Sequence, residues 1–263
     1  MTGAEMADDP VLFEQRGGIA IATLNRPDAR NAVNGAVSAA LGEIAERVES
    51  DDSIRVAILT SSSPRAFCAG ADLAEVARGN RNSISHPIYG FGGFVQFPRR
   101  KPWIAAVNGF AMGGGFELAI SCDLIVAGEG AQFGLPESLR GLFAAAGGAF
   151  RLARLIPRAV ANEVLVTGLR LDAQRALSLG LVNRVVPEAD VLGSAVALAE
   201  TVAQSAPLSI AASLDLARQA FDHDEAGLWE LTRQHAATVM RSADAIEGAT
   251  AFIQKRAPQW TGT

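Results

Sequence analysis

The chain has 263 residues and a mass of 27.4 kDa; 49% of the residues are hydrophobic and 19% are charged. This composition excludes a disordered or low-complexity protein, and the length suits one large domain or two small ones with a sizeable core. The net charge of −5 and the absence of a basic patch argue against nucleic-acid binding.

The cysteines and the N-terminal segment bear on the cellular compartment. Cys68 and Cys122 are too few for a disulfide framework and show no metal-ligand spacing, which favours a reducing environment. Residues 1–10 are acidic and lack the basic start and apolar run of a signal peptide. Since no apolar stretch approaches the ~18–20 residues that span a bilayer, we expect a cytoplasmic protein.

The first half of the chain predicts alternating strands and helices. Two β-type runs, residues 11–16 and 19–24, flank Gly17-Gly18, which is a two-residue hairpin signal. Apolar residues at three- and four-residue spacing then predict a helix over residues 35–49. The remaining segments predicted in this half are strands at 54–60, 103–107, 124–127 and 131–133 and a helix at 117–120.

Helical patterns dominate after about residue 147, with one more strand at 181–186. The predicted helices are 149–155, 159–166, 172–179, 189–204, 208–221, 226–240 and 243–255. No linker is evident, so the pattern favours one α/β unit with a helical C-terminal extension. We place the core in residues 1–200 and the helical region of the same structural unit in residues 201–263.

Several catalytic motifs are missing. The Gly90-Phe91-Gly92 segment lacks the later glycine of a dinucleotide fingerprint, and there is no Gly-Lys-Ser/Thr phosphate loop. Neither a G-x-S-x-G elbow nor an H-E-x-x-H pair occurs. The sequence therefore gives little support to a dehydrogenase, a P-loop protein or a zinc hydrolase.

Two glycine-containing segments are candidate anion sites. Residues 66–73 (AFCAGADL) are small enough for a ligand to approach the backbone, although a tight loop packed under a helix has the same composition. Residues 108–118 (NGFAMGGGFEL) bring three glycines to the start of a helix, where unpaired N–H groups suit an oxyanion. Glu117 falls in that first turn; helix capping and close packing are the alternative explanation.

A third segment, residues 133–137 (FGLPE), carries a candidate acid. Glu137 lies among apolar neighbours, and apolar surroundings raise the pKa of a carboxyl group into the range useful for proton transfer. An exposed loop glutamate is the alternative. The three histidines, His86, His223 and His235, have no metal-ligand spacing, so surface or structural roles are favoured for them. For Cys68, a role as a small buried residue is favoured over that of a nucleophile.

Together these segments resemble the crotonase (enoyl-CoA hydratase/isomerase) superfamily, over almost the whole chain. The matching elements are Ala69-Gly70-Ala71-Asp72, Asn108-Gly109, Gly113-Gly114-Gly115, Glu117 and Pro136-Glu137. The resemblance implies an α/β crotonase-like spiral of β-β-α units. It also implies a C-terminal helical region used in trimerisation, giving a homotrimer or a dimer of trimers.

The resemblance further implies reversible hydration of a 2-enoyl-CoA to a 3-hydroxyacyl-CoA. The thioester carbonyl would lie between the backbone N–H groups of Ala71 and Gly114, Glu117 would act as base on water, and Glu137 would protonate the α-carbon. Because two close carboxylates repel, one of their pKa values should rise. No metal or redox cofactor is implied, and coenzyme A enters as part of the substrate.

The implied substrate-binding residues fall into two groups. The first lies in the two glycine-containing segments and would bind the substrate or its coenzyme A: Ala69, Ala71, Asp72, Leu73 and Gly114. The second binds coenzyme A, with Arg30 near its phosphates and Phe252 and Lys255 reaching the coenzyme A of a neighbouring subunit. Alternatively, Arg30 is a solvated loop charge and the other two residues end an amphipathic helix.

The chain departs from the family pattern at Ala144-Ala145, where many short-chain hydratases have a proline-glycine pair. This change puts the shape of the pocket and the identity of the substrate in question. The alternatives that remain open are an enoyl-CoA isomerase, an enzyme resembling a crotonobetainyl-CoA hydratase, and a non-catalytic acyl-CoA-binding homologue.

Overall fold

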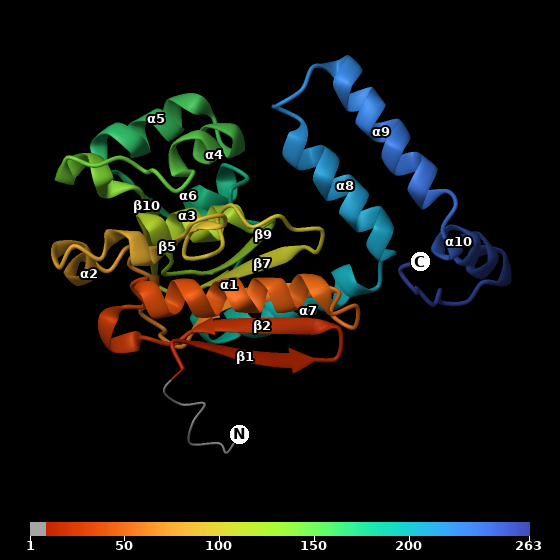
Figure 1. The fold of residues 1–263 in the computed structure, drawn as a ribbon, viewed down its shortest axis with the longest axis horizontal. Coiled ribbons are helices and arrows are strands. Elements are labelled where there is room, and N and C mark those ends of the chain that lie inside the picture. The colour runs from red at the N-terminus through yellow and green to blue at the C-terminus, as the bar shows by residue number, and fades with distance from the viewer. Residues whose placement is uncertain (1–8) are drawn as a thin grey trace.

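The computed structural model describes residues 9–263, so most of the acidic N-terminal segment lies outside the described residues. Its main sheet has six strands in the order β1-β2-β3-β7-β9-β12 (Figure 1). These strands are β1 Val11–Arg16, β2 Ile19–Leu24, β3 Val56–Ser61, β7 Trp103–Val107, β9 Leu124–Gly128 and β12 Arg184–Val186. Only β1 and β2 pair antiparallel, through the hairpin at Gly17, whose φ is 56°.

A second sheet of four short strands has the order β11-β10-β8-β4. Its strands are β11 Arg170–Asp172, β10 Gln132–Gly134, β8 Phe110–Met112 and β4 Ala66–Cys68, and a separate pair joins β5 Ser85–His86 to β6 Gly90–Phe91. The helices are α1 Gly35–Ser50, α2 Leu73–Ala77, α3 Gly114–Ser121, α4 Gly148–Leu155, α5 Arg158–Thr167, α6 Ala173–Ser178, α7 Val191–Ala203, α8 Pro207–Gln219, α9 Glu225–Val239 and α10 Ala243–Gln254. Short 3₁₀ turns, η2 Pro27–Ala29, η3 Arg81–Ile84, η4 Pro136–Arg140 and η5 Glu188–Asp190, complete the described elements.

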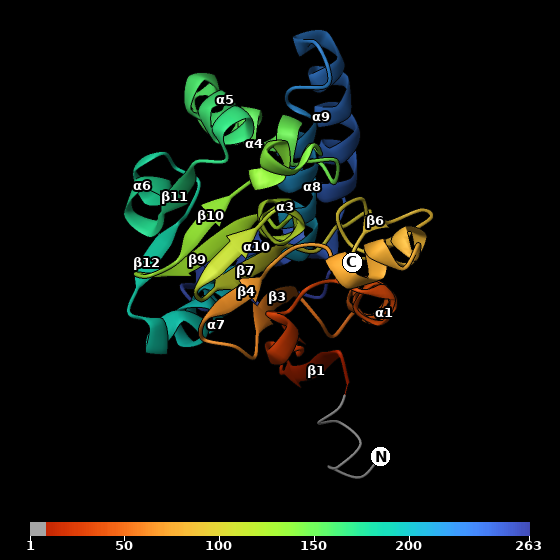
Figure 2. The same cartoon turned by 90° about the vertical axis from the view of Figure 1, so that its left-hand side faces the viewer.

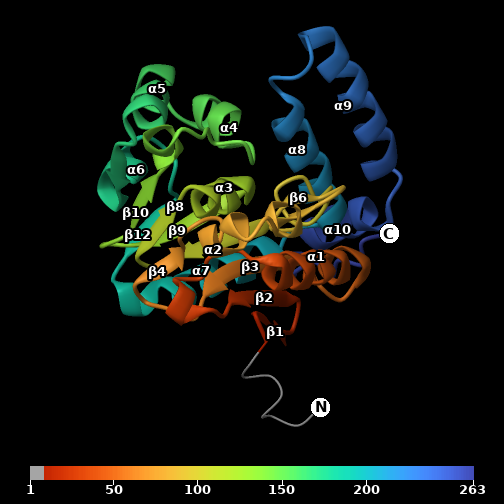
Figure 3. The ribbon, with the colours of Figure 1, turned by 60° about the vertical axis from the view of Figure 1, so that its left-hand side comes forward.

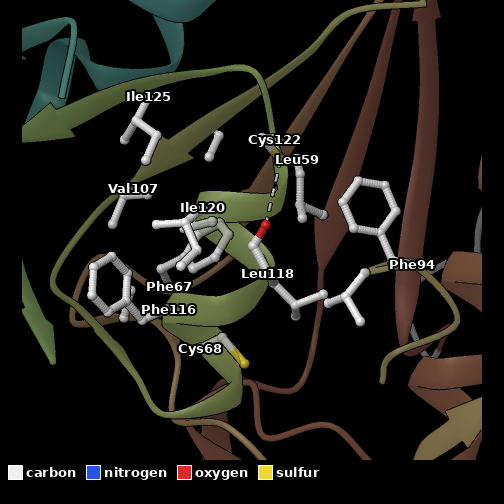
Figure 4. Close-up of a cluster of buried hydrophobic side chains, with 14 of the residues drawn as sticks. Leu59, Phe67, Cys68, Phe94, Val107, Phe116, Leu118, Ile120, Cys122 and Ile125 are labelled. Atoms are coloured by element: carbon white, nitrogen blue, oxygen red, sulfur yellow. Dashed lines mark hydrogen bonds between the residues drawn. The ribbon is translucent and has the colours of Figure 1, made fainter. Parts of the chain in front are cut away.

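The main sheet is buried on both faces, as expected for parallel strands. Alternate residues of β3 serve different clusters: Val56 and Ile58 pack with α7, whereas Ala57 and Leu59 join the larger core. On that larger side, Phe116 and Leu118 of α3 lie among Phe67 and other buried side chains (Figure 4). All residues of α3 are buried, so the helix is fixed in the core by packing on every side.

The helical elements divide between two places. Helices α4, α5 and α6 gather on the side of the molecule opposite β1 and α1 (Figure 2). The α8–α9 hairpin stands away from the α/β body (Figures 1 and 3), and neither helix has a fully buried residue. Arg218 of α8 ties this arm to the body through Asp123, at 2.7 Å.

The predicted α/β class and the longer elements are confirmed, with shifted ends. The strand predicted over 54–60 begins at Val56, and the one predicted over 181–186 shrinks to Arg184–Val186. The sequence pattern does not predict β4, β8 or β11, because three residues are too few to show a periodicity. The division at residue 200 stays a prediction.

The hydropathy of the helices bears on membrane insertion. Among residues 9–263, no single helix is long and apolar enough to cross a membrane. The segments Glu188–Ala203 and Pro207–Gln219 meet the requirement of length and composition only as a pair, with a bend of 109° between them.

Candidate active site

A cavity of about 840 Å³ opens between the body and the loops that follow β4, β8 and β10. Its lining combines apolar side chains with backbone from two glycine-containing turns, and it includes both predicted glutamates. The lining residues that matter for the chemistry are Ala69, Gly70, Ala71, Leu73, Gly113, Gly114, Glu117, Glu137, Ala145 and Ala146. The structure therefore brings all three candidate segments to one place.

Two residues of the cavity lining, Ala71 and Gly114, carry backbone N–H groups without a partner among the described residues. The bridge between Val33 and Ala71 uses the N–H groups of Val33 and Asp72, so the N–H of Ala71 stays outside it. Gly114 is the first residue of α3, where a helix leaves its N–H groups unpaired. Within residues 9–263 neither N–H has a hydrogen-bond acceptor. Two such donors suit the developing negative charge of an oxyanion.

Gly70 allows these two turns to meet. Its φ is +95°, and a Cβ atom there would lie 2.9 Å from the carbonyl oxygen of Met112 and 3.1 Å from the nitrogen of Gly114. Any larger residue would push the two N–H donors apart. The small residues of the segment 66–73 thus permit a close approach of backbone to backbone.

Glu117 is almost completely buried, with 3% of its surface exposed, in the first turn of α3. Its Oε1 accepts a hydrogen bond of 2.8 Å from the N–H of Gly148. Burial raises the pKa of Glu117 to about 7; repulsion from Glu137 adds to the rise, and the N–H groups of Gly148 and Ala146 oppose it. A carboxyl group with this pKa can act as a base near neutral pH.

Glu137 stands at the start of η4 and is half-buried. Its Oε2 is shielded from solvent and has no hydrogen-bond partner among the described residues. Burial raises the pKa of this carboxyl group as well. Gly113 makes room for it, since a Cβ atom at Gly113 would lie 3.1 Å from Oε1 of Glu137.

The pKa values of the two glutamates differ from the prediction made from the sequence. We expected mutual repulsion to raise one of the two pKa values, but both are raised, and burial is the larger cause at each glutamate. The two groups differ instead in their hydrogen bonds: Glu117 accepts a backbone N–H, whereas the buried Oε2 of Glu137 has no partner among the described residues.

The other predicted substrate-binding residues are divided. Ala69 and Leu73 line the cavity, but Asp72 does not. Its carboxylate caps α2 by accepting the N–H of Ala74 at 3.1 Å, and it forms an ion pair with Arg26 at 3.0 Å. Asp72 thus positions the turn.

The three residues expected to bind coenzyme A lie outside the cavity lining within this chain. Arg30 is exposed directly after η2. Phe252 is 85% exposed near the end of α10, and Lys255 forms the left-handed C-cap of the same helix. Helix α10 lies across the molecule from α2, which borders the cavity (Figure 1). Their proposed contact with coenzyme A stays a prediction.

Sequence reasoning missed the loop that closes one side of the cavity, residues 84–96. His86 lines the cavity from there; its ring stacks on Tyr89 at 4.4 Å, and its Nδ1 accepts the N–H groups of Ile88 and Tyr89. Phe91 covers Gly114, where a Cβ atom would lie 2.5 Å from the ring. The positive-φ residues Gly90 and Gly92 were the available signal.

No group of three or more potential ligands (His, Cys, Asp or Glu) is placed to bind a metal ion within residues 9–263. Cys68 is fully buried beside the cavity turn, and burial raises the pKa of its thiol to about 12. A thiol with that pKa stays protonated at neutral pH, which agrees with a packing role.

Comparison with known proteins agrees with this geometry. The family model described as enoyl-CoA hydratase/isomerase matches residues 14–263. The chain belongs to this family. The resemblance drawn from the glycine turns and the two glutamates is therefore confirmed.

Individual members of the family are similar along almost their whole length. A crystal structure of an enoyl-CoA hydratase from Mycobacterium tuberculosis H37Rv superposes with a TM-score of 0.94 at 42% identity, covering 97% of this chain and 100% of that one. A carnitinyl-CoA dehydratase from Proteus mirabilis is 41% identical over 252 residues, 94% of this chain and 96% of its own. A crystal structure of a carnitinyl-CoA hydratase from Mycobacterium avium is 44% identical, covers 97% and 99%, and has a TM-score of 0.76. The crotonase fold of this chain is thereby confirmed.

Proposed function

We propose that this family member catalyses reversible hydration of a 2-enoyl-CoA to a 3-hydroxyacyl-CoA. The observation that carries the proposal is the convergence of Glu117, Glu137 and the free N–H groups of Ala71 and Gly114 on one cavity. A hydro-lyase needs a base, an acid and an oxyanion site within reach of one substrate. This arrangement supplies all three.

The proposed steps use the roles that the family resemblance implies for each group. Ionised Glu117 takes a proton from water, and the water oxygen adds to C3 of the enoyl group. The electron pair of the double bond moves to the thioester oxygen, where the N–H groups of Ala71 and Gly114 stabilise the enolate. Protonated Glu137, whose pKa is raised by burial, then donates its proton to C2. Dehydration of the 3-hydroxyacyl-CoA is the reverse sequence.

The acyl group is the open part of this proposal. The names of relatives such as the Proteus mirabilis enzyme favour a carnitinyl or crotonobetainyl group, and Ala145 in the cavity lining differs from the pattern of many short-chain hydratases. A quaternary ammonium binds best against aromatic faces and carboxylates. Phe91 and Phe143 offer such faces, but the two carboxylates of the described lining are those assigned to catalysis, and Arg140 and Arg170 add positive charge to it. This balance favours an uncharged acyl group.

A substrate panel tests both candidates. Purified protein is mixed with crotonyl-, hexenoyl-, decenoyl- and crotonobetainyl-CoA, and the loss of enoyl thioester absorbance is followed. We expect consumption of at least one uncharged enoyl-CoA. Turnover of crotonobetainyl-CoA alone would select the second candidate, and a shifted double bond without added water would select isomerisation. Tight binding without any consumption would overturn the catalytic proposal.

We also propose a homotrimer or a dimer of trimers, which would complete the coenzyme A site with Phe252 and Lys255 of a neighbour. Large exposed apolar side chains on the C-terminal arm, among them Trp229, Ile246 and Phe252, support assembly through this region. Sedimentation of the purified chain measures the state directly. The cytoplasmic location stays a prediction.

A further inference from the structure

Arg151, in the first turn of α4, is a half-buried arginine without an ion-pair partner among the described residues. Its Nη2 donates to the carbonyl oxygen of Val95 at 2.5 Å, and its Nη1 donates to that of Ala146 at 3.2 Å. Arg154, one turn later, pairs instead with Asp222 at 2.7 Å. Partial burial of a guanidinium without an ion-pair partner costs free energy, so the position of Arg151 needs a reason.

The turn that Arg151 holds is the turn that holds Glu117. Gly147 has a φ of +102°, and a Cβ atom there would lie 2.4 Å from Nη1 of Arg151, so the backbone wraps closely around the guanidinium. The next residue, Gly148, donates its N–H to Oε1 of Glu117. Two hydrogen bonds and one short turn therefore connect the guanidinium to the carboxylate.

The charges around these two groups are few. Glu117 faces Glu137 from η4 and Arg151 from α4. Arg151 faces one carboxyl group, that of Glu117, and two other arginines, Arg99 and Arg154. The buried thiol of Cys122 is also nearby. Glu117 is thus the carboxylate that balances the charge of Arg151, across the turn at 146–148.

We propose that Arg151 is a positioning residue for the hydration proposed above, on which this inference rests. It fixes the turn at 146–148 so that the N–H of Gly148 stays on Glu117, and it places positive charge behind that carboxylate. The positive charge favours the ionised form of Glu117, which is the form that takes a proton from water. The positive charge of Arg151 also opposes the rise in the pKa of Glu117 that burial causes.

Three variants test the proposal. Arg151→Gln removes the positive charge and the paired N–H donors of the guanidinium, whereas Arg151→Lys keeps the charge alone. Arg154→Gln is the matched control on the same helix. We expect Arg151→Gln to move the acidic limb of the kcat/KM profile upward by about 1 pH unit. We expect kcat to fall by about 10–100-fold, with a smaller change in KM. Arg151→Lys should keep the wild-type limb with a lower kcat, and Arg154→Gln should match wild type.

A titration that needs no turnover separates this proposal from the proposed function. The carboxyl carbon of Glu117, assigned with Glu117→Gln, is followed by carbon-13 NMR in the wild type and in the three variants. An upward shift of its pKa in Arg151→Gln supports the proposal even if no enoyl-CoA is consumed. An unchanged pKa in folded Arg151→Gln would overturn it. If that variant does not fold, Arg151→Lys tests the proposal instead. A wild-type kcat in Arg151→Lys would show that the paired guanidinium donors are not needed, and would overturn the proposal.

Discussion

Replacing Glu117 by glutamine should change the way in which the free energy of unfolding depends on pH. The carboxyl group has an ordinary pKa of 4.5 when the chain is unfolded and a pKa of about 7 when it is folded, chiefly because of burial. Between these values the folded protein holds a proton that the unfolded chain has released. Unfolding therefore releases a proton, and stability falls as pH rises through this window.

The magnitude follows from the same two values. A difference of about 2.5 pH units corresponds to about 3 kcal/mol of stability, present below pH 4.5 and lost by about pH 7. Glutamine keeps an oxygen that can accept the N–H of Gly148 but carries no proton to lose. The free energy of unfolding of Glu117→Gln should therefore equal that of the wild type in acid and exceed it by about 3 kcal/mol towards pH 8.

Urea unfolding followed by circular dichroism between pH 5 and 8 measures this difference at fixed protein concentration. Glu163→Gln, at an exposed position of α5, is the control and should run parallel to wild type at every pH. Parallel curves for Glu117→Gln and wild type would refute the reasoning, because they would mean that Glu117 has the same pKa in both states.

Three further perturbations have defined outcomes. Glu137→Gln should lower kcat by about 10²–10⁴-fold while binding of a 3-hydroxyacyl-CoA, measured by calorimetry, changes little; equal activity would remove Glu137 from the mechanism. Gly70→Ala should cost about 1–3 kcal/mol in thermal unfolding and lower kcat, because its φ is +95° and its Cβ would press on Met112 and Gly114; a stable and fully active variant would contradict the described turn. Lys255→Ala should weaken coenzyme A binding, measured as Kd in the assembled protein, more than it lowers kcat; an unchanged Kd would exclude that contact.

The parts of the site that the sequence predicted are those with a local cause. Three consecutive glycines ahead of a helix indicate unpaired N–H groups wherever that helix lies, and Gly114 fulfils this expectation. Likewise, the apolar residues around Glu137 indicated a raised pKa, and burial does raise it. Neither inference required knowledge of a distant contact.

The parts that the sequence did not predict depend on contacts between distant residues. The hydrogen bond from Gly148 to Glu117 joins positions 31 residues apart, and no pattern in either segment indicates it. The ion pair of Asp72 with Arg26 spans 46 residues and turns an expected substrate contact into a structural one. That Arg151 has no ion-pair partner among residues 9–263 is evident only once its surroundings are known.

The sequence by itself therefore determined the α/β class, the family and the residue types available for chemistry, because periodicity, turn glycines and specific motifs are properties of neighbouring residues. The tertiary structure alone decided which residues meet in the cavity and what their pKa values are. It placed Glu117 beside the turn that Arg151 holds and buried Oε2 of Glu137 without a hydrogen-bond partner among the described residues. The physical reason is that burial and electrostatic interaction depend on distance in space, which the order of residues does not contain.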